Sequence, residues 1–83
     1  MIIEIAPKAK KQMAKLPKIV ALAVISKIRG LAENQLNLQI KKLQKRKDMY
    51  RVRVGDYRII YQNSNNVIEV IAVQHRKDVY REL

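Results

Sequence analysis

The clearest pattern of hydrophobic and polar positions in the chain lies on either side of Gly55-Asp56. Apolar and polar residues alternate through both flanking runs, and a glycine at the first central position of a two-residue loop is typical of a type II′ β-hairpin turn. Because side chains alternate faces with period two, this turn predicts that Arg53 faces Arg58 and that Tyr50 faces Tyr61. The predicted apolar face of the hairpin consists of Tyr50, Val52, Val54, Tyr57, Ile59 and Tyr61.

The opposite face of the predicted hairpin carries three arginines, Arg51, Arg53 and Arg58. Arginine on a solvated face can serve simply to cover apolar surface with its long stem. Against that interpretation, no acid lies between Tyr50 and Val54, and the directly opposed Arg53 and Arg58 repel one another, which destabilises a sheet. We interpret the cluster as the binding site of an anion.

The amino-terminal half of the chain predicts a short strand followed by two helices. The β-branched residues of segment 1–5 indicate a strand, which Pro7 ends because proline offers no donor to a ladder. Apolar residues at helical spacing predict a basic helix over 8–16, interrupted at Pro17, and a second helix over 17–33. The predicted core face of the second helix consists of Ala21, Val24, Ile25, Ile28, Leu31 and Ala32.

The carboxyl-terminal half adds a turn at 63–66 and an almost wholly apolar strand at 67–73, which we place in the centre of the sheet. Segment 34–37 is a connection, and segment 38–43 fits either a loop or a short helix. The whole chain, 1–83, is predicted to be a single α+β domain. Its antiparallel sheet packs against an amino-terminal helical hairpin, in the order β-α-α-β-β-β with a short carboxyl-terminal tail.

Composition narrows the chemistry that the chain can support. The 83 residues contain no cysteine, which excludes disulfides, a thiolate zinc site and a thiol nucleophile. The longest apolar run, 19–25, is far shorter than the ~20 residues that a membrane span needs. No secretion signal is visible at the amino terminus. We therefore expect a cytoplasmic protein that has no membrane partner.

The formal net charge is +11, and the basic residues are densest over 41–62, where eight bases accompany two acids. This charge predicts a polyanionic partner, because neutralising phosphates releases counterions and drives binding. Five of these bases precede the hairpin, and they form either a solvated turn or a basic rim that grips a phosphate backbone beside the arginines. The candidate RNA-binding residues are Lys41, Lys42, Lys45, Arg46 and Lys47.

The run Tyr50–Tyr61, with His75–Tyr80 after a further strand, resembles the RelE family of bacterial and archaeal toxins, within the RelE/ParE superfamily. The predicted order of helices and strands matches that family too. The resemblance implies the toxin of a type II toxin–antitoxin system, an endonuclease that cleaves messenger RNA in the ribosomal A site without metal or cofactor and so inhibits translation. It also implies three partners: the ribosome with its message, an acidic RelB-like antitoxin that folds as it binds, and operator DNA reached through the antitoxin complex.

The resemblance also implies which residues act. In the best-known members, two strand cations, an arginine on the next strand, a second arginine after the last strand and a tyrosine near the carboxyl end share the catalysis. Those positions are Arg51, Arg53, Arg58, Arg76 and Tyr80 in this chain. The two strand cations are lysines in those members, and the segment between the last two positions is shorter here. The departure at the strand cations bears on the identity of the general base.

Metal-free RNA cleavage needs a base for the ribose 2′-hydroxyl, cations for the phosphorane and an acid for the leaving oxygen. Arginine suits the second role, since its planar fork binds phosphate oxygens, but it keeps its proton at working pH and makes a poor base. The candidates for the base are Tyr80, whose ionised form nearby arginines favour, and His75, the residue type that titrates near neutrality. The expected roles of the arginines are contact with the scissile phosphate, by Arg58 and Arg76, and positioning of the RNA, by Arg51 and Arg53.

Two other functions fit the same sequence. The ParE branch of the superfamily poisons DNA gyrase and cleaves nothing, but the tail from Arg76 to Tyr80 favours the nuclease branch. A non-catalytic basic protein that binds RNA would need only the net charge of +11. The gathering of cations on one hairpin face, with a tyrosine near the end of the chain, favours the toxin over that alternative.

Overall fold

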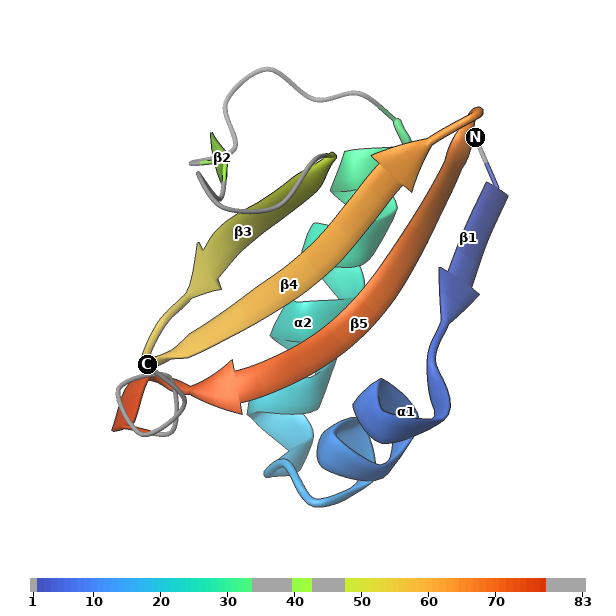
Figure 1. Ribbon diagram of the computed structural model, residues 1–83. Coiled ribbons are helices and arrows are strands. Elements are labelled where there is room, and N and C mark those ends of the chain that lie inside the picture. Colours follow the sequence, from blue (N-terminus) through green and yellow to red (C-terminus); the bar gives the residue numbers. More distant parts are fainter. Residues whose placement is uncertain (1, 34–39, 43–47, 78–83) are drawn as a thin grey trace.

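The computed structural model describes residues 2–33, 40–42 and 48–77 of the chain, the middle segment by its backbone. Its strands form one five-stranded sheet in the order β1-β5-β4-β3-β2. Figure 1 shows α2 running behind this curved sheet, which confirms the predicted α+β class. The elements are β1 (Ile2–Ile5), α1 (Pro7–Ala14), α2 (Lys18–Ala32), β2 (Ile40–Lys42), β3 (Met49–Val54), β4 (Tyr57–Ser64) and β5 (Val67–His75).

Strands β3, β4 and β5 form an antiparallel meander joined by two tight turns. Gly55 begins the first turn with a φ of 57°, a left-handed conformation that glycine adopts without a Cβ penalty. Asn65 and Asn66 make the second turn with φ values of 51° and 62°, the pair of left-handed residues that a type I′ turn requires. The predicted turn at 63–66 is therefore shorter than expected, because β4 continues through Ser64.

The register of the β3–β4 hairpin is confirmed. Arg53 pairs with Arg58, and Tyr50 pairs with Tyr61. The two tyrosine rings stack with their centroids 5.6 Å apart, and both pack against the hydrophobic core. The period-two pattern around the turn was sufficient to fix which side chains share a face.

The predicted antiparallel sheet needs one correction, because β1 runs parallel to β5 and the sheet is mixed. The apolar pattern of β1 identified a strand, but it contains no information about the direction of a partner at the other end of the chain. The edge strand β2 is a second correction, since segment 38–43 was expected to be a loop or a short helix. Ile40 of this strand lies opposite Val52 of β3.

Strand β5 contains a β-bulge at its centre. The flanking pairs are Tyr61 with Val70 and Ile60 with Ala72, which leaves Ile71 as the extra residue. The bulge interrupts the alternation of side chains along β5. The apolar residues that face the helices before the bulge and those that do so after it are therefore not spaced by multiples of two. This is one reason why the strand is apolar almost throughout.

The hydrophobic core lies between the sheet and α2. Val24, Ile28 and Leu31 form the buried side of this helix, as predicted. The prediction is wrong for Ile25, which is 37% exposed because successive residues of a helix point about 100° apart and Val24 occupies the centre of the buried side. The other core residues are Ala9, Val52, Val54, Ile59, Tyr61, Ile68, Val70 and Val73.

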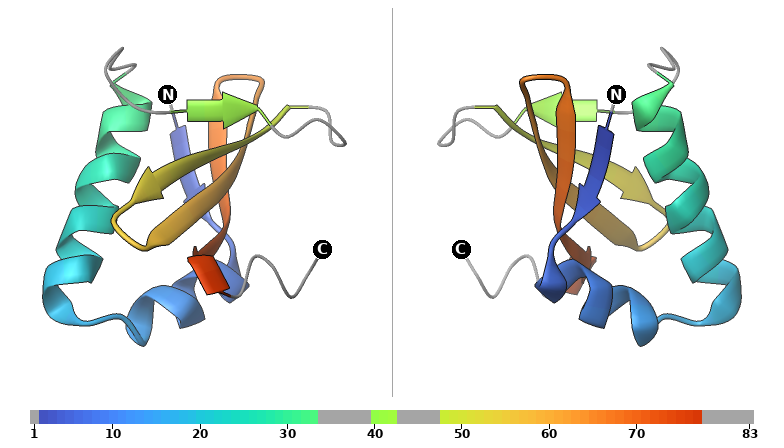
Figure 2. Two further views of the ribbon diagram at one scale, coloured as in Figure 1. Left: turned by 90° about the vertical axis from the view of Figure 1, so that its left-hand side faces the viewer. Right: turned by 90° about the vertical axis from the view of Figure 1, so that its right-hand side faces the viewer.

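The two helices do not lie side by side as the predicted hairpin. In Figure 2, α2 runs along the face of the sheet, whereas α1 crosses below its end. α1 packs on β5 at the point where β1 has stopped. There the backbone N–H of Val73 donates a hydrogen bond to Oε1 of Gln12 at 2.7 Å. The Gln12 side chain thus supplies an acceptor where the neighbouring strand has ended.

Candidate functional site

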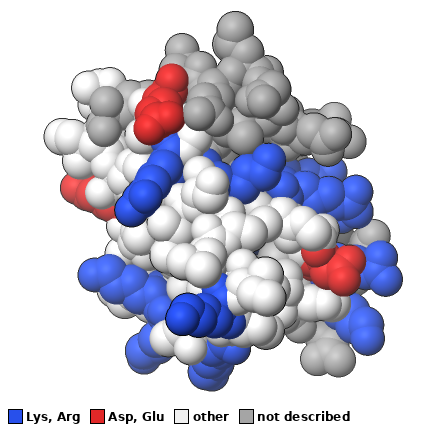
Figure 3. All heavy atoms as spheres, turned by 180° about the vertical axis from the view of Figure 1, so that it is seen from behind, with Lys and Arg blue, Asp and Glu red and all other residues white. Residues whose placement is uncertain are grey.

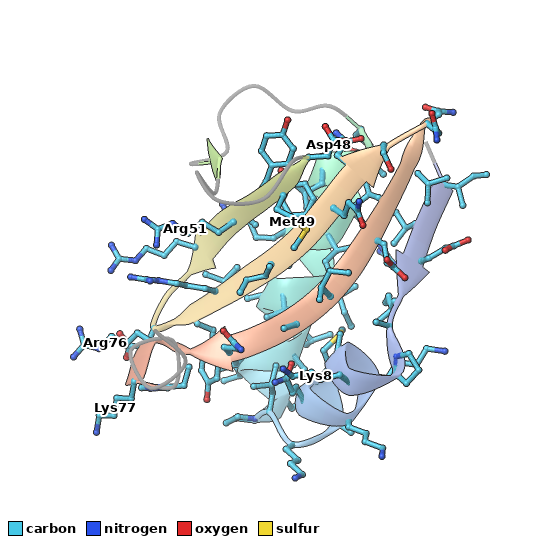
Figure 4. All side chains as sticks on the ribbon, viewed as in Figure 1. Lys8, Asp48, Met49, Arg51, Arg76 and Lys77 are labelled. Carbon is cyan, nitrogen blue, oxygen red and sulfur yellow. The ribbon has the colours of Figure 1, made fainter. Side chains whose placement is uncertain are left out.

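The three arginines of the hairpin lie on the face of the sheet opposite α2. Arg51 and Arg53 flank the buried Val52 along β3, and Arg58 precedes the buried Ile59 along β4. Because the valine and the isoleucine pack toward the helices, alternation directs the arginines to the other side. Figure 4 shows Arg51 extending away from the ribbon. We call this cluster of Arg51, Arg53 and Arg58 the arginine face.

A row of side chains crosses the arginine face from strand to strand. Arg53 pairs with Arg58, and Arg58 pairs in turn with Gln74 on β5. Gln74 is 3% exposed, and its amide adds a neutral donor and acceptor to the row. Gln74 was not among the site residues predicted from the sequence. Gln74 is a polar residue at the end of an apolar run. Extending the hairpin register by one strand would have placed it beside Arg58.

The fourth predicted arginine, Arg76, is held beside the arginine face by its backbone. Its N–H donates a hydrogen bond to the carbonyl oxygen of Asp56 at 2.8 Å. Since Asp56 belongs to the β3–β4 turn, residue 76 lies next to the turn that Arg53 and Arg58 flank. Arg76 is exposed, and Figure 4 places it with Lys77 at this end of the molecule.

His75 lies on the other side of the sheet. It pairs with Tyr57, and the two rings meet edge to face with their centroids 5.1 Å apart. Tyr57 precedes Arg58 along the strand, so alternation turns this ring pair toward the helices. Nδ1 of His75 accepts a hydrogen bond from the backbone N–H of Lys77 at 3.2 Å. The structure therefore does not bring His75 together with the arginines.

Part of the predicted basic rim adjoins the site. Lys41 and Lys42 belong to β2, and the register places Lys41 opposite Arg51. Both lysines therefore occupy the strand next to the arginine face. The remaining predicted site residues lie outside the described part of the chain: Lys45, Arg46, Lys47 and Tyr80.

Unlike charges are separated across the face of the sheet opposite α2. Among the residues that the structure describes, no ion pair joins a carboxylate to the arginine face. Glu4 and Glu69 lie opposite one another on β1 and β5, away from the strands that carry the arginines. Asp48 and Asp56 lie near the two ends of β3, but no described ion pair joins them to the arginines, so the arginine face keeps a positive potential that attracts anions.

Tyr61 lies on the helix side of the hairpin, and it is 3% exposed. Burial, with a smaller contribution from the nearby Tyr50, raises the pKa of Tyr61 to about 12. Its phenol therefore stays protonated at neutral pH. Tyr61 supports the sheet beneath the arginines and is no candidate for a base.

Two further features of the described residues bear on function. Within segments 2–33 and 48–77, no three acidic or histidine side chains are grouped so that they could hold a metal ion. Neither α1 nor α2 is long and apolar enough to cross a membrane.

Sequence comparison matches nearly the whole chain to one toxin family. The family profile described as ParE toxin of type II toxin-antitoxin system, parDE, covers residues 3–80. Toxin RelE3 of Methanocaldococcus jannaschii is 43% identical over 47 residues, a stretch that covers 57% of this chain and 53% of that relative. The chain thus spans about half the length of this relative.

Structural comparison finds the same fold in two archaeal complexes. A chain of the RelB-RelE antitoxin-toxin complex from Methanococcus jannaschii matches with a TM-score of 0.82 and 26% identity, over 96% of this chain and 98% of that one. A chain of the RelE-RelB complex from Pyrococcus horikoshii OT3 matches with a TM-score of 0.74 and 26% identity, over 90% and 93% of the two chains. Both matches extend over the helices and the sheet together.

Proposed function

This chain belongs to the ParE toxin family of type II toxin–antitoxin systems, within the RelE/ParE superfamily, and on that premise we propose that it is a ribosome-dependent endonuclease that cleaves messenger RNA. The observation that carries the proposal is the direct opposition of Arg53 and Arg58, with Arg51 beside them, on the face opposite α2. Repelling charges on neighbouring strands suit a site whose ligand carries phosphate. The similarity to RelE toxins supports messenger RNA as that ligand.

In the proposed reaction, the ribose 2′-oxygen attacks the adjacent phosphorus while the bond to the 5′-oxygen breaks. The 2′-hydroxyl gives its proton to a base and the leaving 5′-oxygen takes one up from water, which leaves a 2′,3′-cyclic phosphate and a 5′-hydroxyl. Arg58 and Arg76 bind the scissile phosphate and stabilise the charge of the phosphorane, while Arg51 and Arg53 position the RNA.

The base in this proposal is Tyr80, by elimination among the other candidates. Arginine keeps its proton at working pH. Burial raises the pKa of Tyr61 and keeps its phenol neutral, and His75 faces the helices with Nδ1 engaged by a backbone N–H. The ribosome holds the message in line for attack and supplies the orientation that so small a site lacks. Free RNA is then a poor substrate.

The proposed partner in the cell is an acidic antitoxin that folds as it binds. Both archaeal relatives were solved as complexes of RelE with RelB. The net charge of +11 favours an acidic segment, and coupled folding suits an inhibitor that must be released. Through that complex the pair would reach operator DNA. Ribosomes place the proposed action in the cytoplasm.

The matching family is described as ParE toxin, and this description supports a second candidate function. A ParE-like toxin would act on DNA gyrase and leave RNA intact. The arginine face would then bind an acidic or nucleic acid surface without any reaction.

One experiment separates the two functions. The purified protein is added to a translation reaction with and without ribosomes, message ends are mapped, and supercoiling by purified gyrase is measured in parallel. We expect new message ends at A-site codons only when ribosomes are present, and unaffected supercoiling. Intact message together with inhibited gyrase would replace the nuclease by the gyrase poison.

A further inference from the structure

The chain takes up a helical conformation directly after β5, at Arg76 and Lys77. The first backbone N–H groups of a helical turn have no acceptor within the turn and need one from elsewhere. The N–H of Arg76 donates to the carbonyl oxygen of Asp56 at 2.8 Å, and the N–H of Lys77 donates to Nδ1 of His75 at 3.2 Å. Both acceptors therefore hold the backbone of the segment that carries the fourth arginine.

His75 occupies the N-cap position, immediately before this helical turn. The side chain of an N-cap accepts a hydrogen bond from the N–H of the second or third helical residue, and Lys77 is the second. The usual N-cap residues are asparagine, aspartate, serine and threonine. Nδ1 of histidine is bonded to Cγ, as Oδ1 of asparagine is, so a neutral imidazole with its proton on Nε2 can accept the same hydrogen bond.

The imidazole ring of His75 is oriented by Tyr57. The two residues pair across the β4–β5 ladder, and their rings meet at 86° with the centroids 5.1 Å apart. This contact lies on the helix side of the sheet, away from the arginine face, and it limits the rotation of the imidazole. His75 can therefore affect the arginine face only through the backbone that it holds.

The net charge of the protein does not by itself determine where a phosphate binds. Figure 3, drawn from behind the sheet, shows lysines and arginines around that face as well. Figure 4 shows Arg76 extending to the same side of the molecule as Arg51. Selective binding of a phosphate at the arginine face thus requires particular cations to be held in place, and the placement of a long, exposed side chain begins with its backbone.

We propose that His75 is a positioning residue for Arg76. As the N-cap, it fixes through Nδ1 the helical turn from which the guanidinium group of Arg76 reaches a phosphate bound at the arginine face. The inference rests on the proposed function for the role of Arg76. This role of His75 requires an acceptor atom and no proton transfer, so it differs from the role of a general base.

Two variants of the full chain separate the acceptor from the ring. His75→Asn keeps an acceptor on Cγ and removes the ring, whereas His75→Phe keeps a ring against Tyr57 and removes the acceptor. Each variant is also combined with Arg76→Ala. All measurements are made at about pH 8, where an ordinary imidazole is neutral.

Three quantities are measured for each protein. The first is the single-turnover rate of cleavage on programmed ribosomes. The second is the affinity for a short single-stranded RNA that carries 2′-methoxy groups and cannot be cleaved, from fluorescence anisotropy. The third is the rate at which the Lys77 amide exchanges its hydrogen with water, from nuclear magnetic resonance, which reports the capping hydrogen bond directly.

We expect His75→Asn to stay within about twofold of the parent in all three measurements, because asparagine is a good N-cap. His75→Phe should lower the cleavage rate about five- to tenfold and the RNA affinity about threefold, and its Lys77 amide should exchange several-fold faster, as the loss of a cap implies. In the Arg76→Ala background, His75→Phe should change neither cleavage nor affinity further, because the residue through which it acts has been removed.

Three results would overturn the positioning role. They are a His75→Phe variant that matches the parent, a His75→Asn variant that loses as much as His75→Phe does, and an effect of His75→Phe that persists in the Arg76→Ala background. If thermal unfolding shows that His75→Phe does not fold, His75→Ala, which lacks both ring and acceptor, is compared with His75→Asn in its place. A parent that binds the RNA but cleaves no message contradicts only the proposed function, and RNA affinity and amide exchange then decide the role of His75.

Discussion

Arg53 and Arg58 raise the energy of the folded protein by facing one another across the β3–β4 ladder. No ion pair among the described residues offsets that repulsion. A phosphate group that binds between the two guanidinium groups would relieve it. At these two positions the pair of arginines lowers the stability of the fold but favours the binding of phosphate. A pair that served only the structure would not lower stability.

We expect Arg53→Ala and Arg58→Ala to lower ribosome-dependent cleavage by about 2–4 kcal/mol of transition-state stabilisation each, the scale for removing a fixed charged donor. The melting temperature should stay level or rise, because each change removes a like-charge contact. Single-turnover cleavage and thermal unfolding measure the two effects. Lys10→Ala, an exposed cation on α1, is the control and should alter neither. Full activity in both arginine variants would remove the site from this face.

The identity of the base can be tested through the pH dependence of cleavage. We expect the rate to rise with pH as the Tyr80 phenol ionises, and Tyr80→Phe to lower it while leaving ribosome affinity nearly unchanged. His75→Gln should have the smaller effect, because its ring packs against Tyr57 on the other side of the sheet. Single-turnover rates on programmed ribosomes across about pH 6–9 decide between them. A pH dependence that disappears in His75→Gln and persists in Tyr80→Phe would transfer the role to the histidine.

Tyr61 should make the stability of the protein depend on alkaline pH. Its pKa is raised from 10.0 to about 12 by burial, so the unfolded chain loses this proton first. The stabilisation is complete below pH 10 and is lost as pH rises toward 12, by up to about 2–3 kcal/mol. Urea unfolding across this range, compared with Tyr61→Phe, measures the effect as the difference between the two slopes. Parallel curves for parent and variant would mean that the phenol titrates normally.

At the scale of elements, a side-chain hydrogen bond adds to the packing of α1 on β5. Gln12→Met keeps a side chain of similar length but leaves the Val73 N–H without its acceptor, and we expect a loss of about 1–3 kcal/mol in the free energy of unfolding. Gln12→Glu retains an acceptor oxygen and should lose less. Denaturant unfolding of both variants provides the measurement. Equal losses of unfolding free energy in Gln12→Met and Gln12→Glu would show that α1 stabilises the protein by packing and not by this hydrogen bond.

The sequence predicted the elements that local chemistry determines. The β3–β4 register follows from Gly55 and from period-two alternation, and the placement of Arg51, Arg53 and Arg58 on one face follows from that register. Both depend only on residues close together in the chain. The position of Arg76 followed less directly, since it depends on where β5 ends relative to the turn.

Other features depended on contacts between distant parts of the chain. The parallel pairing of β1 with β5 and the pairing of β2 with β3 leave no local periodicity to read. The exposure of Ile25 was missed because an apolar stripe on a helix looks the same whether a sheet or a partner covers it. His75 was grouped with the arginines because it is close in sequence to Arg76, although it faces the helices.

At the scale of the whole molecule, the charge distribution should govern binding. With a net charge of +11, affinity for a short single-stranded RNA should fall steeply with salt. We expect Arg51→Ala to reduce the slope of log affinity against log salt by about one, and Lys10→Ala to leave it unchanged. Fluorescence anisotropy across about 0.05–0.5 M salt measures both slopes. A shared slope for all three proteins would indicate diffuse attraction without a defined phosphate contact.

The parallel pairing of β1 with β5 also determines when this protein can become complete. Strand β1 pairs with β5, which is synthesised after all the other described strands, and hydrogen bonds from Ile2 to Asn66 and from Ala6 to Val70 close the two ends of that pair. Long-range pairing of this kind forms late, because most of the intervening chain must be ordered first. A nascent chain whose β5 is still inside the ribosome therefore cannot close its sheet or bring Arg76 to the β3–β4 turn. We expect the sheet to close, and Arg76 to reach the β3–β4 turn, only after all of β5 has emerged from the ribosome.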